Sequence, residues 1–215
     1  MRLLETIEIK LDNEEIIRLL KSKKSMKRKP TQKMIDDINH LKEYVLQFIQ
    51  PRGVYDVFDS KELQPQFLFS KSEKTILAVC TIGKQLEEKI ANIMDEGELA
   101  KGVILDAIAS HAAEETAEQF NQIILEEIKN QIKDKEVTCR FSPGYCQWVL
   151  EEGQRMIFNS LPTEFIDVTL SVSMMMKPIK SVSFAFNIGT EVDKELGLRE
   201  CETCDMINCS YRKTN

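Results

Sequence analysis

Several stretches of the chain carry the hydrophobic pattern of β-strands. Residues 75–81, Thr-Ile-Leu-Ala-Val-Cys-Thr, are apolar almost throughout, which is typical of a central strand covered on both faces. Residues 181–186, Ser-Val-Ser-Phe-Ala-Phe, alternate between small and large side chains, as a strand with two different faces does. Alternation or short apolar runs predict further strands at 3–11, 54–58, 137–141 and 167–173.

Helical spacing of apolar residues predicts helices between these strands, over residues 13–20, 32–50, 84–94, 98–133 and 149–159. The pattern over 98–133 is the longest, and it contains small residues at Ala109, Ala113, Thr116 and Ala117. Small side chains let another backbone approach closely, so this helix is expected to be central and well covered.

The same long helix carries a second pattern, in which Asp106, Ser110, Glu114 and Glu118 follow one another in steps of four. We call these four residues the acidic stripe, because the spacing places them on one helix face. One interpretation is a face exposed to solvent. The other places Glu114 beside the segment that follows the helix, where its carboxylate binds a ligand ammonium or sulfonium.

Composition and charge limit the class of protein. The 215 residues are 42% hydrophobic, which is enough for one core, and the elements predict a single α+β domain over residues 1–199. A formal net charge of −6 argues against a general nucleic-acid binder. No run approaches the roughly 18 apolar residues of a membrane helix, and no signal peptide is visible, so we expect a cytoplasmic protein.

The segment Arg140 to Trp148, Arg-Phe-Ser-Pro-Gly-Tyr-Cys-Gln-Trp, is the strongest candidate for chemistry. Pro143-Gly144 signals a tight turn, which can leave backbone groups open to a ligand. Arg140 can hold a carboxylate through two parallel hydrogen bonds, and Tyr145 adds a flat wall with a hydroxyl. Together they suit a small zwitterion such as an amino acid; alternatively, the segment is a plain turn with Arg140 in a surface ion pair.

Residues 200–215 form a separate tail that contains Cys201, Cys204 and Cys209 in a C-x2-C-x4-C pattern. Thiolates at this spacing can share a zinc ion or an iron–sulfur cluster, although a fourth ligand is missing. Cys139 or Cys146 supplies it only if the tail folds back over the turn. Reduced thiols without a metal are the alternative.

Three segments together resemble the activation domain of cobalamin-dependent methionine synthase. Residues 140–145 read Arg-x-Ser-Pro-Gly-Tyr, and the family's S-adenosylmethionine signature reads Arg-x-Ala-Pro-Gly-Tyr. Residues 106–118 resemble the helix that precedes this signature. Residues 174–183, Met-Met-Met-Lys-Pro and then Lys-Ser-Val-Ser, resemble the strand near its C-terminal end, but Asn187 stands where the family has a tyrosine after that strand.

The resemblance implies an α+β fold with a twisted antiparallel sheet flanked by long helices. It also implies binding of S-adenosylmethionine, with Arg140 on the methionine carboxylate, Glu114 on the amino side, backbone contacts from Ser142 and Gly144, and Tyr145 beside the ligand. As a residue that holds a ligand, Arg140 is expected to be accessible in the free protein. No residue of this chain is expected to be a nucleophile, because the cobalamin of the family accepts the methyl group.

A chain without cobalamin, folate or homocysteine domains resembles the free-standing relatives, so we expect a module that reactivates a corrinoid methyltransferase in trans. An electron from a flavodoxin- or ferredoxin-type donor and the methyl group would restore methylcobalamin on that partner. A second hypothesis is a redox or metal-binding accessory protein that uses the tail cysteines. A third is a protein that uses the fold to bind another adenosyl or amino-acid ligand, because fold does not fix function.

Overall fold

An antiparallel sheet forms the centre of the computed structural model, which describes residues 1–20, 29–194 and 196–197. The sheet order in this part of the chain is β1-β2-β3-β7-β4. The strands are β1 (Arg2–Leu4), β2 (Arg52–Asp59), β3 (Lys74–Thr81), β7 (Ser181–Gly189) and β4 (Glu136–Val137). The three tail cysteines and the boundary predicted between residues 199 and 200 lie outside the described residues.

The middle of the sheet follows the sequence prediction. β3 lies between β2 and β7, and its register runs from Lys74 opposite Asp59 and Ile188 to Thr81 opposite Arg52 and Ser181. All residues of β3 after Lys74 are buried, which explains its continuous apolar run. The mixed architecture of an antiparallel sheet and long helices confirms the predicted α+β class.

Three predicted strands are wrong in length. The strand expected over 137–141 is reduced to β4 and a single bridge between Phe141 and Ala185. The strand expected over 3–11 ends at Leu4, because Leu4 pairs with Gly53 and its partner strand begins at Arg52, just after Pro51. The strand expected over 167–173 shrinks to β5 (Thr169–Leu170), which pairs with β6 (Met176–Lys177). Between them the backbone turns, closed by a hydrogen bond from Ser171 N to Met175 O.

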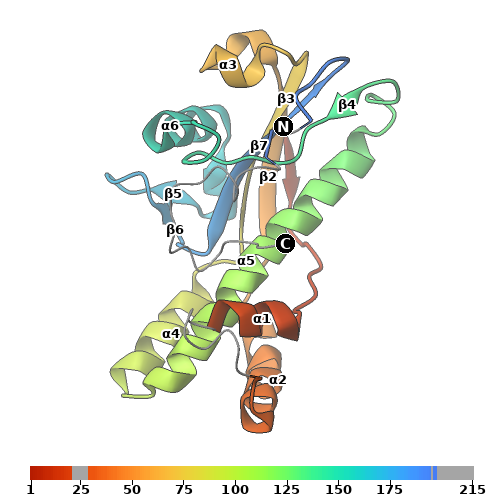
Figure 1. Cartoon of the computed structure of the whole chain (residues 1–215). Helices are drawn as coiled ribbons and strands as arrows, with labels where there is room; N and C mark the ends of the chain where they lie inside the picture. The colour runs from red at the N-terminus through yellow and green to blue at the C-terminus, as the bar shows by residue number, and fades with distance from the viewer. Residues whose placement is uncertain (21–28, 195, 198–215) are drawn as a thin grey trace.

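The helices divide into groups around the sheet (Figure 1). The 30-residue helix α5 (Leu99–Ile128) crosses one face of the sheet with its C-terminal half. Its N-terminal half extends beyond the sheet and packs with α1 (Asn13–Leu20), α2 (Gln32–Leu46) and α4 (Gln85–Asp95). The other face is covered by α3 (Gln66–Phe69), α6 (Leu150–Ser160) and the 3-10 segment η2 (Thr163–Ile166), while the 3-10 segment η1 (Ser60–Glu62) follows β2.

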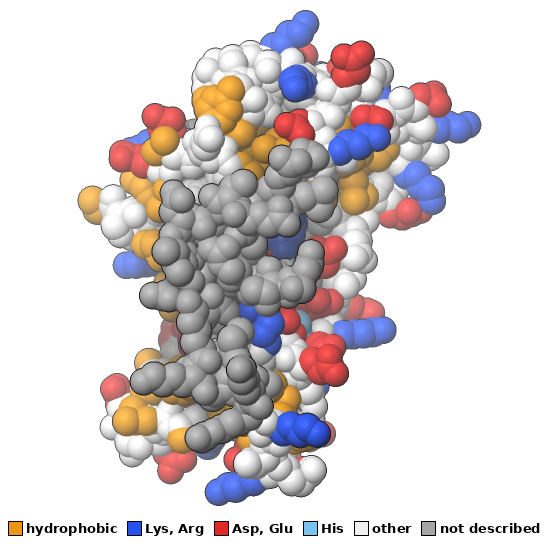
Figure 2. All heavy atoms as spheres, viewed as in Figure 1, with side chains coloured by type: hydrophobic (Ala, Val, Ile, Leu, Met, Phe, Trp, Pro, Cys, Tyr) orange, Lys and Arg blue, Asp and Glu red, His pale blue; other side chains and the backbone are white. Residues whose placement is uncertain are grey.

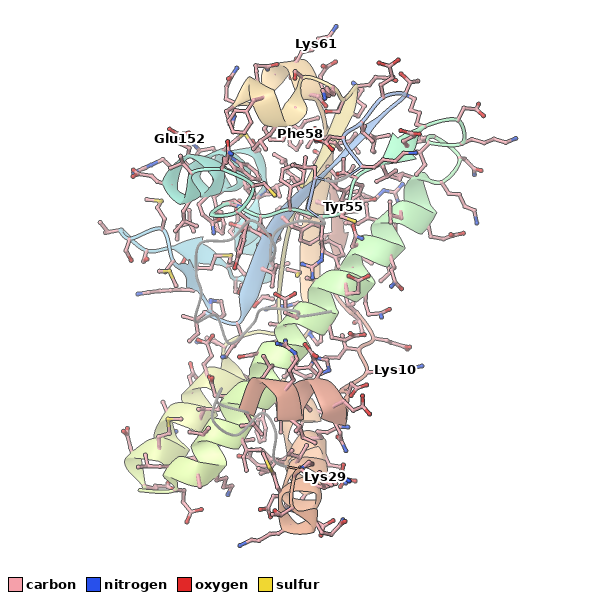
Figure 3. All side chains as sticks on the ribbon, in the orientation of Figure 1. Lys10, Lys29, Tyr55, Phe58, Lys61 and Glu152 are labelled. Atoms are coloured by element: carbon pink, nitrogen blue, oxygen red, sulfur yellow. The ribbon has the colours of Figure 1, made fainter. Side chains whose placement is uncertain are left out.

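Helix α5 approaches the sheet closely because β2 offers a glycine beneath it. A Cβ atom on Gly53 would lie 2.5 Å from the ring of Phe120. The Phe120 ring packs edge to face against Tyr55 of β2 and Phe184 of β7, with centroid distances of 6.0 and 6.2 Å. The hydroxyl of Tyr55, a residue labelled in Figure 3, donates a hydrogen bond to the carboxylate of Glu127 of α5. The predicted small residues of α5 are buried, as expected for a central helix.

None of the helices within the described ranges has both the length and the apolar composition that a bilayer span requires.

A buried histidine ties the start of α1 to α5. The backbone N–H of Asp12 donates to Nε2 of His111 across 2.9 Å, and His111 is only 6% exposed. Burial lowers the pKa of His111, and the charge of Lys42 lowers it further. The neighbouring carboxylates of Glu115, Glu15 and Asp12 oppose this shift without reversing it. The hydrogen bond therefore requires neutral imidazole, whose Nε2 accepts.

We predict that the protein loses stability as the pH falls below about 6.5, the ordinary pKa of histidine in an unfolded chain. The pKa of His111 is lower in the folded protein than in the unfolded chain, so the unfolded chain binds the extra proton in that pH range. For a single site, the free energy of unfolding can fall by at most about 1.4 kcal/mol per pH unit. Chemical denaturation at pH 7.5 and 5.5 measures the loss, which should be smaller in His111→Gln than in the wild type.

The chain provides a matched control, because its other histidine, His40, is exposed. His40→Gln should keep the wild-type difference between the two pH values. The prediction fails if both variants show the wild-type decrease in the free energy of unfolding between pH 7.5 and 5.5. The acid sensitivity would then come from the carboxylates.

Candidate ligand-binding site

Buried aromatic residues hold both ends of the turn between β4 and α6. Phe141 and Trp148 are each 1% exposed, and their ring centroids lie 5.6 Å apart. Phe69 of α3 packs against both rings. On the helix side, a Cβ atom on Gly153 of α6 would lie 2.7 Å from the Trp148 ring. The turn is therefore fixed to the core on the α6 face of the sheet.

The backbone of the turn uses conformations that are costly for most residues. Gly144 has φ of 92°, and the non-glycine residues Cys146 and Gln147 have φ of 50° and 62°. The N–H of Gly144 donates to Trp148 O across 2.8 Å, and the N–H of Tyr145 donates to Ser142 O across 3.1 Å. The N–H of Gly144 is engaged inside the turn, so a backbone contact from Gly144 to a ligand would use its carbonyl oxygen.

Arg140 points to the opposite face from Phe141, toward α5. Its Nη2 lies 2.7 Å from Glu114 Oε2, and its Nε lies 3.6 Å from Glu118 Oε2. The guanidinium also lies over the ring of Phe184, 5.9 Å from the centroid. The side chain of Arg140 is 22% exposed, whereas those of Glu114 and Glu118 are about half exposed.

The charges around Arg140 affect its pKa more than its burial does. Burial by itself lowers the pKa of Arg140, but the Glu114 charge and hydrogen bond, with the charge of Glu118, leave the pKa raised. The guanidinium is thus a permanent cation within reach of both carboxylates. The accessible arginine expected from the sequence is not observed, because the Arg140 side chain is only 22% exposed and is paired with two carboxylates.

A second cation meets the first half of the acidic stripe. Lys180, just before β7, has a side chain that is 12% exposed. Its Nζ lies 2.7 Å from Asp106 Oδ1 and donates to Ser110 Oγ across 2.8 Å. The stripe is thus no plain solvent face, because both of its halves contact a cation from another element. Figure 2 shows acidic and basic side chains interspersed on the part of this face that the undescribed residues leave visible.

The structure brings some of the predicted site residues together. Arg140 and Glu114 are in direct contact, although they are 26 residues apart. Ser142, Gly144 and Tyr145 lie in the turn that follows Arg140, and Tyr145 is 49% exposed. The sequence does not predict Lys180 as a neighbour of the stripe, because no local pattern indicates which helix the residue before β7 contacts.

Two small cavities in the described part of the chain lie elsewhere. One, of about 70 Å³, lies beside Asn187, and the other, of about 180 Å³, lies between Ile128 of α5 and β3. None of the predicted ligand residues lines either of them. Glu114 is about half exposed, so a ligand at Arg140 and Glu114 would contact the surface of α5.

Among the described residues, no group of three or more His, Cys, Asp or Glu side chains could hold a metal ion. Cys201, Cys204 and Cys209, the predicted metal ligands, lie outside this part of the chain.

The fold has a counterpart among solved structures. The MetH reactivation domain bound to AdoHcy superposes with a TM-score of 0.61 at 14% sequence identity, over 87% of this chain and 78% of that one. The resemblance inferred from the sequence is therefore confirmed at the level of the fold. No family model matches the chain, and the search of curated proteins gave no match.

We predict that Arg140→Ala lowers the free energy of unfolding by about 1–2 kcal/mol, between the cost of an exposed ion pair and that of a buried one. The reason is that Arg140 joins the edge of the sheet to α5 through two carboxylates and also packs on Phe184. Urea denaturation of both proteins measures the difference.

Arg155→Ala is the matched control, because Arg155 pairs only with Glu151 of its own helix among the interactions described, and both side chains are more than half exposed. We expect a loss below about 0.5 kcal/mol there. Equal losses in the two variants would mean that Arg140 contributes no more than a surface residue.

Proposed function

We propose that this chain binds S-adenosylmethionine at Arg140 and the adjacent turn, and acts as a stand-alone module for reductive reactivation of a corrinoid methyltransferase in trans. The observation that carries the proposal is the contact between Arg140 and Glu114, whose Nη2 and Oε2 atoms lie 2.7 Å apart. The fold supports it, since its solved counterpart was crystallised with AdoHcy.

An arginine and a glutamate side by side complement the amino-acid end of such a ligand. The carboxylate of the ligand would bind the guanidinium of Arg140, and its ammonium would bind Glu114. One internal ion pair is then exchanged for two between protein and ligand. Glu118 remains beside Arg140, so no charge is left buried without a partner.

The turn supplies the remaining contacts in this proposal. The carbonyl of Ser142 accepts one hydrogen bond from Tyr145 N–H and retains a second lone pair. Gly144 is exposed and has no side chain, which lets a ligand approach its carbonyl. The half-exposed ring of Tyr145 would flank the ligand.

In this proposal, no residue of this chain reacts chemically during methyl transfer. The methyl group would pass to the corrinoid that the partner carries, after an electron arrives from a flavodoxin- or ferredoxin-type protein. The residues here would bind and orient the sulfonium, which converts a bimolecular encounter into an oriented one. The stripe has three carboxylates, and two cations, Arg140 and Lys180, contact it. The remaining negative charge favours a positively charged ligand.

Isothermal titration with two ligands tests the binding site. S-Adenosylmethionine carries the amino-acid end, whereas 5′-methylthioadenosine lacks it. We expect Glu114→Gln to weaken binding of S-adenosylmethionine about tenfold or more, the loss of a charge-assisted hydrogen bond, and to leave methylthioadenosine unchanged. Glu126→Gln is the control, because Glu126 also lies on α5 but pairs with Lys129 in an exposed position.

Two results would refute the binding claim: no heat from the wild type at millimolar S-adenosylmethionine, or equal weakening of both ligands by Glu114→Gln. Action in trans is tested separately. The protein is mixed with a cobalamin-loaded methionine synthase that lacks its own activation domain, a reductant and S-adenosylmethionine. The spectrum of methylcobalamin should appear only when this chain is present.

A further inference from the structure

The larger of the two cavities in the described part of the chain has an apolar base. It lies between the C-terminal end of α5 and the sheet, and its volume is about 180 Å³. Ile76 of β3, Ile188 of β7 and Ile128 of α5 line it, and each is at most 4% exposed. Val57 of β2 also lines it, opposite Ile76, and is 39% exposed. The cavity is therefore apolar at its base and reaches solvent beside Val57.

The turn that follows α5 supplies another wall of this cavity, with Gln131, Ile132 and Lys135. The backbone N–H groups of Gln131 and Ile132 donate to Ile128 O across 2.8 and 3.2 Å. The N–H of Lys135 donates to Ile132 O across 3.0 Å. These hydrogen bonds fix the turn, so the wall is formed before a ligand arrives, which lowers the conformational cost of binding.

Two lysines bring positive charge to the cavity. Lys74 lies two residues before Ile76 in β3, so both side chains share one face of the sheet. The ammonium of Lys74 lies 3.5 Å from Asp59, and that of Lys135 lies 2.7 Å from Glu73. Both lysines line the cavity, whereas the two carboxylates do not. An ammonium has three N–H donors, so each lysine retains donors for a second anion.

The volume of the cavity limits the size of a ligand. An apolar protein cavity of about 150 Å³ binds benzene, which has six carbon atoms. About 180 Å³ therefore accommodates a chain of roughly six to eight carbon atoms. The isoleucines at the base favour an aliphatic chain, and the lysines favour a negative charge at one end of it.

We propose that this cavity binds a small aliphatic carboxylate with about six to eight carbon atoms. The alkyl chain packs on Ile76, Ile128 and Ile188, and the carboxylate accepts hydrogen bonds from Lys74 and Lys135. None of the residues proposed to hold S-adenosylmethionine lines this cavity, so the proposal does not depend on the function proposed for Arg140.

Isothermal titration of the wild type with butanoate, hexanoate, octanoate and decanoate tests the size of the site. Each added methylene group should raise the association constant about fourfold up to about eight carbon atoms, because its burial removes apolar surface from water. Decanoate should bind no more tightly than octanoate, because the cavity is then full. A gain that continues to decanoate, or no heat with millimolar octanoate, overturns the proposal.

Octan-1-ol, which has the same chain without a negative charge, tests the role of the lysines. The wild type should bind octan-1-ol about tenfold more weakly than octanoate, the loss of a charge-assisted hydrogen bond. Lys135→Gln should weaken octanoate about tenfold and leave octan-1-ol unchanged. Lys129→Gln is the matched control, because Lys129 begins the same turn but pairs with Glu126 and does not line the cavity. Equal affinities of the wild type for the two ligands overturn the proposal.

Methyl NMR spectra of the isoleucine-labelled wild type locate the site without any substitution, so a folding defect of Lys135→Gln does not decide the result. Octanoate should shift the methyl signals of Ile76, Ile128 and Ile188. The signals of Ile16 and Ile38, which are buried in the helical cluster of α1, α2 and α5, should stay unchanged. Shifts that leave out the three cavity isoleucines place the ligand elsewhere and overturn the proposal.

Discussion

The contact between Arg140 and the acidic stripe of α5 is the interaction on which the candidate site depends. It joins the edge of the sheet to the longest helix, and both partners come from elements that are fixed in other ways. Backbone hydrogen bonds to β7 hold the neighbouring Phe141, and the packing of Phe120 holds α5 against β2 and β7. With Arg140 on the α5 face and Phe141 on the α6 face, alternation along one short segment connects the predicted ligand residues to both layers.

Local patterns predict the parts of the fold in which burial is complete. The apolar run of β3 and the alternation of β7 identify two paired strands, and the small residues of α5 identify a covered helix. Alternation alone fails for residues 3–11, because a strand also needs a partner. In the register of β1, Thr6 would face Pro51, which lacks a backbone N–H, and the chain leaves the sheet toward α1.

The site is predictable only in part, for a similar reason. The resemblance to a family brings Arg140, Glu114 and the turn together, but no local pattern states that the stripe meets Lys180, 70 residues further along the chain. Asn187 gives a second example. It stands where the family has a tyrosine, and it is 3% exposed, donates to Leu68 O and accepts from Thr75. Its role in this chain is to hold three segments together, and only the tertiary structure reveals that role.

The two sides of Arg140 are held by different parts of the chain. Its side chain lies against α5, while its carbonyl lies against Gly197, after β7. A guanidinium whose backbone is already fixed loses less conformational freedom when a carboxylate binds it. The cost of binding at Arg140 is therefore set mainly by the exchange of ion pairs with Glu114, and only to a small extent by ordering of the backbone.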